Sequence, residues 1–178
     1  AHTGGGNNHA QRQARAQRQA GRLVMSATRD MVREFHQAFD VVDGTRPHVP
    51  LPQSEARWTL TSALQNLNEA LDKFRSVASR DVRALRLALI TEELAELTVA
   101  SIDRNTVGAL DALCDLQYVL DGTVLAFGMD GVADEAFRRV HASNMSKLGS
   151  DGKPVRDATG KVGKGPNYCP VQLGDLAK

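Results

Sequence analysis

The chain has 178 residues, which is enough material for one domain with a buried hydrophobic core. Its 22 lysines and arginines nearly balance its 21 aspartates and glutamates, so no strong positive field indicates nucleic acid as a partner. Two cysteines without a C-x-x-C pattern argue against structural zinc and suit a reducing compartment. Because no apolar run is long enough to cross a bilayer, we expect a cytoplasmic protein that does not bind membranes.

Residues 1–24 differ in composition from the rest of the chain. They are rich in glycine, asparagine, glutamine, alanine and arginine, and no acidic residue occurs before Asp30. Three interpretations are open: an extension ahead of a natural start at Met25, a disordered native tail, or an arginine-rich targeting signal. The first is favoured, and we expect the structured domain to begin at about residue 25.

Hydrophobic periodicity predicts five helices over residues 25–148. The first covers residues 28–39, with Met31, Phe35 and Phe39 on one face. After a loop with several prolines, residues 55–77 carry apolar side chains at alternating spacings of four and three, a heptad seam that is typical of packing in a bundle or across a dimer. The residues of this seam are Leu60, Leu64, Leu67, Leu71 and Phe74.

Two further helices are predicted over residues 80–102 and 106–127. Both have apolar residues on more than one side, which favours positions in the middle of a bundle. A fifth helix is expected to begin after Asp130 and to reach about Leu148. Residues 149–178 are rich in glycine, lysine and proline, so turns or a small hairpin are expected there. The predicted fold is all-α, a four- or five-helix bundle over residues 25–148 with an irregular basic C-terminal arm.

The helices over residues 80–102 and 106–127 each carry an acidic cluster. Glu92, Glu93 and Glu96 form an E-E-x-x-E run, and Asp111 and Asp115 form D-x-x-x-D after a short connection. At 100° per residue, Glu92 and Glu96 fall on a stripe with apolar residues instead of on a wet face. Like charges at such positions are unfavourable unless a cation compensates them.

An antiparallel helical hairpin would bring the two acidic clusters face to face. Their side chains offer only carboxylate oxygens, with no imidazole or thiolate, and this hard donor set suits Mg²⁺ or Mn²⁺. The plain alternative is that the acids are a solvated surface. Because the second pair follows one short hairpin later and is also level with apolar residues, we favour a metal site.

Amide and lysine groups that could bind phosphate oxygens follow the acidic helices. Asn144 and Lys147 are close together near the end of the fifth helix, and Lys164 lies in the C-terminal arm. Magnesium in proteins commonly binds together with substrate phosphates. Acids for a metal, with lysines and an amide for phosphate oxygens, therefore indicate a polyphosphate ester as the substrate.

Three other side chains near the acids need an interpretation. Arg86 lies two turns before Glu93 and either neutralises it or contacts phosphate. Tyr118 either packs at the edge of the core or contacts the substrate. Cys114, between the two aspartates, is expected to be an inert buried thiol.

Taken together, these segments resemble the MazG-like all-α nucleoside triphosphate pyrophosphohydrolases. The resemblance rests on residues 85–97 (LRLALITEELAEL), residues 111–119 (DALCDLQYV) and the pair Gly122-Thr123. The ending at residues 140–147 (VHASNMSK), with the glycine-lysine pieces between 151 and 168, is similar to the bacteriophage and actinobacterial branch. The resemblance covers residues 28–173 in order, and it implies hydrolysis of a (deoxy)nucleoside triphosphate to the monophosphate and pyrophosphate.

The resemblance also implies roles for single residues. By matching position, Asn144 and Lys147 would be phosphate and nucleotide contacts. Glu93 is favoured as the catalytic base or as a bridging ligand. The residues implied as Mg²⁺ ligands or base are Glu92, Glu93, Glu96 and Asp115.

The chain departs from the family pattern in two places. The second motif is usually E-x-x-D, but Ala112 stands where its glutamate is expected, so Asp111 must take over that ligand. Residues 54–80 also look like an insertion relative to compact members, which leaves the oligomeric interface open.

Two other functions remain possible from the sequence. Phosphoribosyl-ATP pyrophosphohydrolase is the second enzymatic interpretation, because that enzyme has the same fold and acids. A non-catalytic helical binding protein, which would use the heptad seam for a partner, is the third. The expected partners are a nucleotide substrate and further copies of the chain, as a homodimer or homotetramer, with no nucleic acid and no membrane.

Overall fold

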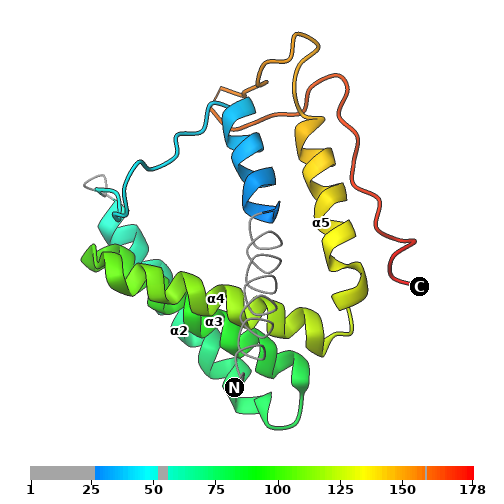
Figure 1. The fold of residues 1–178 in the computed structure, drawn as a ribbon. Helices are drawn as coiled ribbons and strands as arrows, with labels where there is room; N and C mark the ends of the chain where they lie inside the picture. Colours follow the sequence, from blue (N-terminus) through cyan, green and yellow to red (C-terminus); the bar gives the residue numbers. More distant parts are fainter. Residues whose placement is uncertain (1–26, 52–55, 159) are drawn as a thin grey trace, which may run out of the picture. The chain divides into compact units, whose positions relative to one another are not determined.

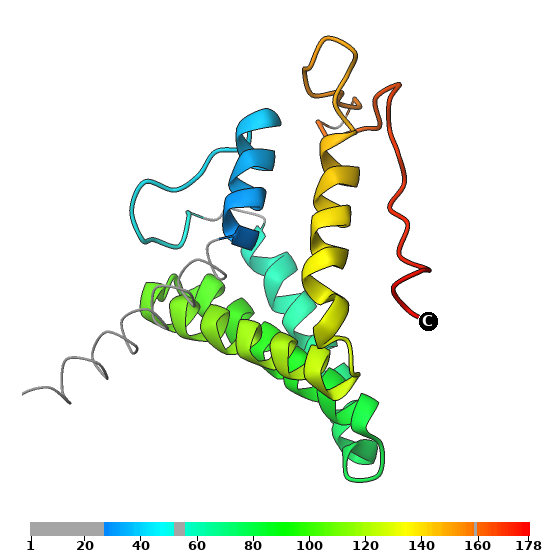
Figure 2. The same cartoon turned by 45° about the vertical axis from the view of Figure 1, so that its right-hand side comes forward.

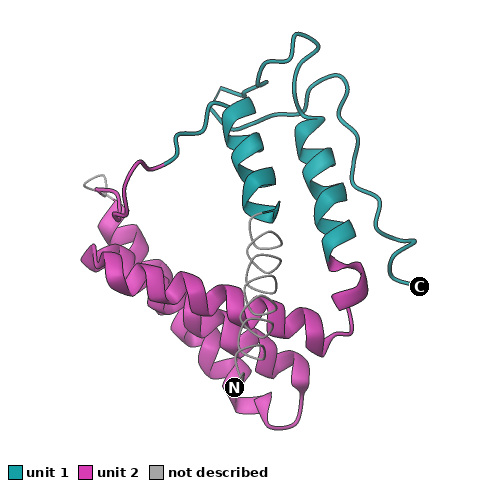
Figure 3. Ribbon diagram, in the orientation of Figure 1, with its two compact units in different colours: residues 1–43, 134–178 teal, residues 44–133 magenta. Residues whose placement is uncertain are grey.

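The computed structural model describes residues 27–51, 56–158 and 160–178. It divides into two compact units, coloured separately in Figure 3. Unit 2 covers residues 44–133, and the described part of unit 1 consists of residues 27–43 and 134–178, except residue 159. The predictions made for residues 1–24 lie outside the described residues.

The described chain is helical, which confirms the prediction of an all-α fold (Figures 1 and 2). Residues 27–38 form a helix, and the labelled helices are α2 (Ala56–Ala78), α3 (Val82–Asp103), α4 (Thr106–Ala126) and α5 (Asp130–Met145). Within these ranges no strand forms, and the arm after α5 contains two isolated β-bridges, Leu148 with Pro154 and Arg156 with Val162. The helix boundaries agree with the predicted ones to within about three residues. None of the described helices is both long enough and apolar enough to span a membrane.

Unit 2 is an antiparallel arrangement in which α3 contacts both α2 and α4. Asp81 caps α3, because its Oδ1 accepts the backbone N–H of Arg83 at 2.8 Å. Arg104 ends α3 in the left-handed conformation with φ of 56°, and Asn105 then caps α4 by accepting the N–H of Gly108 at 3.0 Å. The chain thus reverses over two residues, which sets α4 against α3 as predicted. Within this unit only α3 is central.

The core of unit 2 is built mainly from alanines instead of the leucines that define the sequence periodicity. Leu85, Leu87 and Leu94 of α3 are exposed. Small side chains allow two helices to approach closely, so the alanine faces become the contacts and the larger side chains are turned outward. The buried residues of this unit are Leu71, Ala84, Ala88, Ala95, Ala100, Ala109 and Ala112.

The heptad seam of α2 lies on the side of this helix that is shielded from solvent. Leu71 is buried, and the four other seam residues are half-buried. Because α2 contacts α3, the seam packs within the unit, as the plainer of the two interpretations predicted.

In unit 1, aromatic residues anchor the helix over residues 27–38. Phe35 and Phe39 are stacked with ring centroids 4.1 Å apart, and Phe39 is fully buried. Arg156 of the arm donates to the backbone oxygen of Phe39, and His141 of α5 lies 3.2 Å from Glu34. The predicted apolar face of this helix is therefore confirmed at its C-terminal end.

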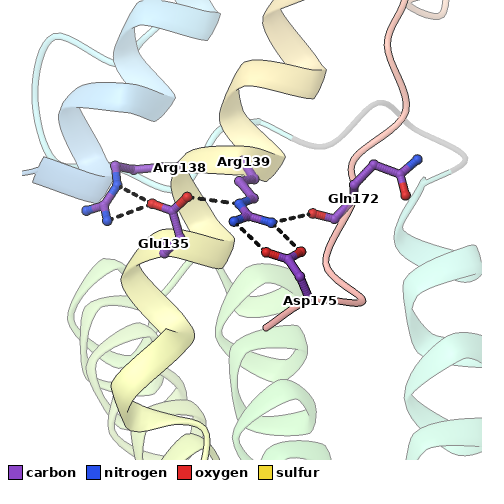
Figure 4. Close-up of polar contacts among 5 residues, drawn as sticks. All are labelled: Glu135, Arg138, Arg139, Gln172 and Asp175. Carbon is purple, nitrogen blue, oxygen red and sulfur yellow. Dashed lines mark hydrogen bonds and ion pairs between the residues drawn. The ribbon is translucent and has the colours of Figure 1, made fainter. Parts of the chain in front are cut away.

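The C-terminal arm is tied to α5 by charged side chains (Figure 4). Both terminal nitrogens of Arg139 bind the carboxylate of Asp175, at 2.6 and 2.9 Å, and one of them also donates to the backbone oxygen of Gln172. Glu135 holds Arg139 and Arg138 from the other side. The arm is irregular, as predicted, but its last residues are fixed by specific contacts.

Candidate active site

The five predicted acidic residues all lie on the α3–α4 hairpin of unit 2. Glu92, Glu96 and Asp111 line one cavity of about 460 Å³, which α2, α3 and α4 enclose together. Polar residues of α2 and of the hairpin connection line the same space, among them Asn68 and Asn105. The cavity is open to solvent along the exposed carboxylates, so Glu92 and Glu96 do not lie on a sealed apolar face.

Glu93 and Asp115 do not line this cavity. Asp115 is exposed, whereas the Oε2 atom of Glu93 is buried and has no hydrogen-bond partner in the structure. The residue with the buried, uncompensated oxygen is thus the one that the sequence analysis favoured as the catalytic base or bridging ligand. An unpaired buried carboxylate oxygen is costly, and such groups commonly mark functional positions.

The environment of Glu93 raises the pKa of its carboxyl above the usual value. Burial is the largest cause, because it disfavours the charged form. The next causes, in decreasing order, are the negative charges of Glu96, Asp115, Glu92 and Asp111. The fold therefore brings the four other predicted acids within electrostatic reach of Glu93.

The chemistry of these residues fits a hard divalent cation. All the donors are carboxylate oxygens, and the buried oxygen of Glu93 lacks the positive partner that a cation would supply. The geometry is not that of a ready-made chelate, because in the described part of the chain no three acidic, histidine or cysteine side chains are close enough to hold one ion. Side-chain rotation on the exposed acids would be needed to close a metal site.

Arg75 of α2 is a charged residue of this cavity that sequence analysis missed. Its Nη2 donates to Oε1 of Glu92 at 2.9 Å, and both side chains line the cavity. The signal was present in the sequence, since Arg75 continues the stripe of Leu64, Asn68 and Leu71 by one helical turn. A basic residue at the end of an apolar seam faces the same side as the seam.

Arg86 lies on α3 opposite Gly122 of α4. Its Nη1 is 3.1 Å from the position that a Cβ at Gly122 would occupy, and its Nε is buried without a hydrogen-bond partner. No ion pair joins Arg86 to Glu93 among the described residues, and Arg86 is not among the main causes of the pKa shift of Glu93. The structure therefore does not show the neutralising pair that was one of the two interpretations of Arg86.

Two further residues that the sequence analysis interpreted are exposed on α4. Tyr118 of α4 is 80% exposed, and Cys114 is exposed as well, so the prediction of a buried thiol was wrong. The reason is that α3 covers only one side of α4 within unit 2, and Cys114 faces another.

Asn144, Lys147 and Lys164 belong to unit 1. Lys147 donates to Oδ1 of Asn144 at 2.8 Å, and Asn144 borders a small cavity of about 100 Å³ together with Phe35. The ammonium of Lys164 lies 4.5 Å from the ring centroid of Tyr168, as a cation–π contact. The structure brings Asn144 and Lys147 together, and their role as phosphate contacts stays a prediction.

Comparisons with known proteins bear on the hairpin directly. The family model of phosphoribosyl-ATP pyrophosphohydrolase matches residues 66–144, a segment that contains all five acids. A crystal structure of a proposed NTP pyrophosphohydrolase from Exiguobacterium sp. 255-15 has the same fold, with a TM-score of 0.51 and 23% identity over 85% of this chain and 92% of that one. No curated protein matched the sequence significantly.

These matches test the resemblance and the enzyme class that the motifs predicted. They do not bear on the bacteriophage and actinobacterial branch, which stays a prediction. The comparisons confirm the resemblance: residues 66–144 match the phosphoribosyl-ATP pyrophosphohydrolase family, and the chain has the fold of an all-α NTP pyrophosphohydrolase.

Proposed function

We propose that this protein hydrolyses a (deoxy)nucleoside triphosphate to the monophosphate and pyrophosphate, with Mg²⁺ as the cofactor and Mn²⁺ as a possible replacement. The observation that carries the proposal is the buried, unpartnered oxygen of Glu93 among four other carboxylates. This arrangement lies inside the segment that matches a pyrophosphohydrolase family. A structural hairpin would have no reason to bury an acid in that setting.

The acids divide into two roles in this proposal. Glu92, Glu96, Asp111 and Asp115 would hold the metal with their exposed oxygens. Bound Mg²⁺ would neutralise polyphosphate oxygens and make a coordinated water more acidic. Glu93 accepts the proton of the attacking water, because its raised pKa brings it closer to the pH at which a general base works best.

The test is a pyrophosphate-release assay on the full chain with the eight common (d)NTPs and dUTP in the presence of Mg²⁺. We expect release from at least one of them, and loss of at least 100-fold in Glu93→Gln, in line with the usual effect of removing a general base. Glu69→Gln is the matched control, because Glu69 is an exposed acid on α2 that does not line the cavity. An active Glu93→Gln enzyme would refute the role of Glu93.

Phosphoribosyl-ATP is the second candidate substrate. The specific observation in its favour is the family model that matches residues 66–144, which is that of phosphoribosyl-ATP pyrophosphohydrolase. Adding phosphoribosyl-ATP to the same assay separates the two, since kcat/KM identifies the preferred substrate. If no substrate is hydrolysed and calorimetry detects no heat with Mg²⁺ or Mn²⁺, the non-catalytic binding protein is the better interpretation.

We also propose that the protein acts in the cytoplasm as a homodimer or homotetramer. Val107, Leu110 and Leu125 of α4 are 79%, 63% and 63% exposed, and a helix that is apolar on several sides is usually covered on several sides. Light scattering of the purified chain tests this, and Leu110→Glu should shift the mass toward the monomer. An unchanged monomer in both proteins would refute the oligomer.

A further inference from the structure

Two buried side-chain atoms stand out because no hydrogen bond satisfies them. Among the described residues they are Nε of Arg86 and Oε2 of Glu93. One belongs to a permanent cation and the other to an acid, and both lie on α3. Since buried polar atoms are nearly always paired, each of these two indicates a missing partner of opposite charge.

Arg86 and Glu93 cannot satisfy each other directly. They are seven residues apart, which places them on nearly the same azimuth of the helix but about 10 Å apart along its axis. Their separation agrees with the absence of an ion pair between them in the described chain. A ligand that satisfies both atoms must therefore present a positive centre at one level and an anion at another, two turns away.

The opposite helix repeats this two-turn spacing. Gly122 faces Arg86, and Asp115, seven residues earlier, acts electrostatically on Glu93. One further repeat leads to Gly108, where an added Cβ would lie 3.5 Å from the Cβ of Ala100. We call this row of facing residues the α3–α4 contact line. It has three successive levels: Arg86 opposite Gly122, Glu93 near Asp115, and Ala100 opposite Gly108.

Gly122 has a steric role at the first of these levels. A Cβ at this position would lie 3.1 Å from Nη1 of Arg86, closer than nine in ten real Cβ contacts, so the guanidinium would have to move. Its φ is not in the left-handed region, and the backbone there has no need of glycine. The absence of a side chain at 122 therefore leaves room for the guanidinium and keeps its donors free.

We propose that Arg86, with the space left by Gly122, binds a phosphate group of the substrate two helical turns from the acids that hold the metal. The inference rests on the proposed function and adds the direction of the polyphosphate along the α3–α4 contact line. A guanidinium suits this role because its donors match phosphate oxygens in pairs and its charge does not depend on pH. The phosphate belongs either to the leaving pyrophosphate or to the nucleoside monophosphate.

Calorimetric titration of the full chain with inorganic pyrophosphate and with AMP, each in the presence of Mg²⁺, tests the proposal and separates the two sources. Arg86→Gln should weaken the binding of one ligand at least 10-fold and leave the other within a factor of about two. Arg86→Lys should keep part of the affinity, since the charge remains but the paired donors are lost. Arg57→Gln, an exposed arginine of α2, is the control and should bind both ligands like the wild type.

Gly122→Ala keeps Arg86 and provides a second variant in case Arg86→Gln does not fold. An alanine favours the helix more than a glycine does, so the melting temperature should hold or rise while the affinity for the same ligand falls. A purely structural role of Arg86 would instead change the melting temperature and leave both affinities unaltered. That result, or wild-type protein that binds neither ligand, overturns the inference.

Failure of this inference can be told apart from failure of the proposed function. If wild type releases pyrophosphate from a nucleotide but both Arg86 variants bind pyrophosphate and AMP normally, only the role of Arg86 is wrong. If wild type hydrolyses none of the substrates, the proposed function fails independently of the titrations.

Discussion

Arg75 Nη2 lies 2.9 Å from Oε1 of Glu92 and links α2 to the first acid of the E-E-x-x-E run. The two side chains are 51% and 37% exposed, so solvent screens the pair, which contributes about 0–1 kcal/mol to stability. Its main effect is on the charge of the cavity. In the proposed metal site, the guanidinium would occupy an oxygen of Glu92 that the metal ion needs.

Arg75→Met should therefore tighten the binding of Mn²⁺ several-fold and change the melting temperature by no more than a few degrees. The variant removes the positive charge and frees the oxygen of Glu92. Titration of Mn²⁺ followed by calorimetry measures the effect, and Lys73→Met is the control because Lys73 is exposed on α2 and does not line the cavity. Weaker Mn²⁺ binding in Arg75→Met would show that Arg75 supports the metal ligands instead of competing for them.

The raised pKa of Glu93 lets us predict how the stability of the metal-free protein depends on pH. Its pKa in the folded state is above the usual value of 4.5, so the folded chain binds a proton that the unfolded chain has released. The stabilising contribution is present below 4.5 and is lost as the pH rises through the raised pKa. Chemical denaturation between pH 4.5 and 8 in a chelator should show a free energy of unfolding that falls in this range.

In Glu93→Gln the same measurement should be flatter, because the amide does not titrate. Glu69→Gln should retain the slope of the wild type, since Glu69 is exposed on α2 and does not line the cavity. Adding Mg²⁺ should restore stability at pH 8 in wild type but less in Glu93→Gln. Equal slopes in all three proteins would contradict the assignment of Glu93 as the buried acid.

Local pattern was sufficient to predict the helices and the position of the five acids on one helical hairpin. The caps at Asp81 and Asn105, and the two-residue connection between α3 and α4, are encoded by neighbouring residues, so the antiparallel hairpin follows from the sequence. The burial of Glu93 was not predicted, because the helical periodicity places Glu92 and Glu96 on the apolar stripe, whereas the buried oxygen belongs to Glu93.

What could not be predicted depends on which residue of another helix lies opposite. Arg75 reaches Glu92 from 17 positions away, and the space for Arg86 exists only because Gly122 of α4 is at the same level. The alanine core was missed for the same reason. Periodicity identifies faces that are apolar, but close approach of two helices selects the face with the smallest side chains.

The hairpin connection offers a test of stability that does not involve the acids. Arg104 has φ of 56°, a conformation that costs a non-glycine residue about 1 kcal/mol, so Arg104→Gly should stabilise the protein by up to about that amount. Asn105→Ala should destabilise it by about 1 kcal/mol, because the N–H of Gly108 loses its acceptor. Denaturant titration of both variants measures the two effects. Destabilisation by Arg104→Gly would mean that the arginine side chain makes a contribution larger than the backbone strain.

We predict that low pH releases the C-terminal arm from α5, because Asp175 holds the arm as a carboxylate. Arg139 is the largest cause of the lowered pKa of Asp175, through their hydrogen bonds. The contribution of this carboxylate to the docked arm is thus present above the usual pKa of 3.8 and is lost as the pH falls through the lowered pKa.

At neutral pH, Asp175→Asn should make the arm more accessible to protease, since the amide cannot form the charged pair with Arg139. Limited proteolysis with mass spectrometry of the cleaved ends measures this, and Asp134→Asn, an exposed aspartate of α5, is the control. Cleavage of Asp175→Asn at the rate of wild type would show that other contacts of the arm are sufficient to hold it, such as the hydrogen bond that the Ser143 hydroxyl donates to the backbone oxygen of Cys169 at 2.8 Å.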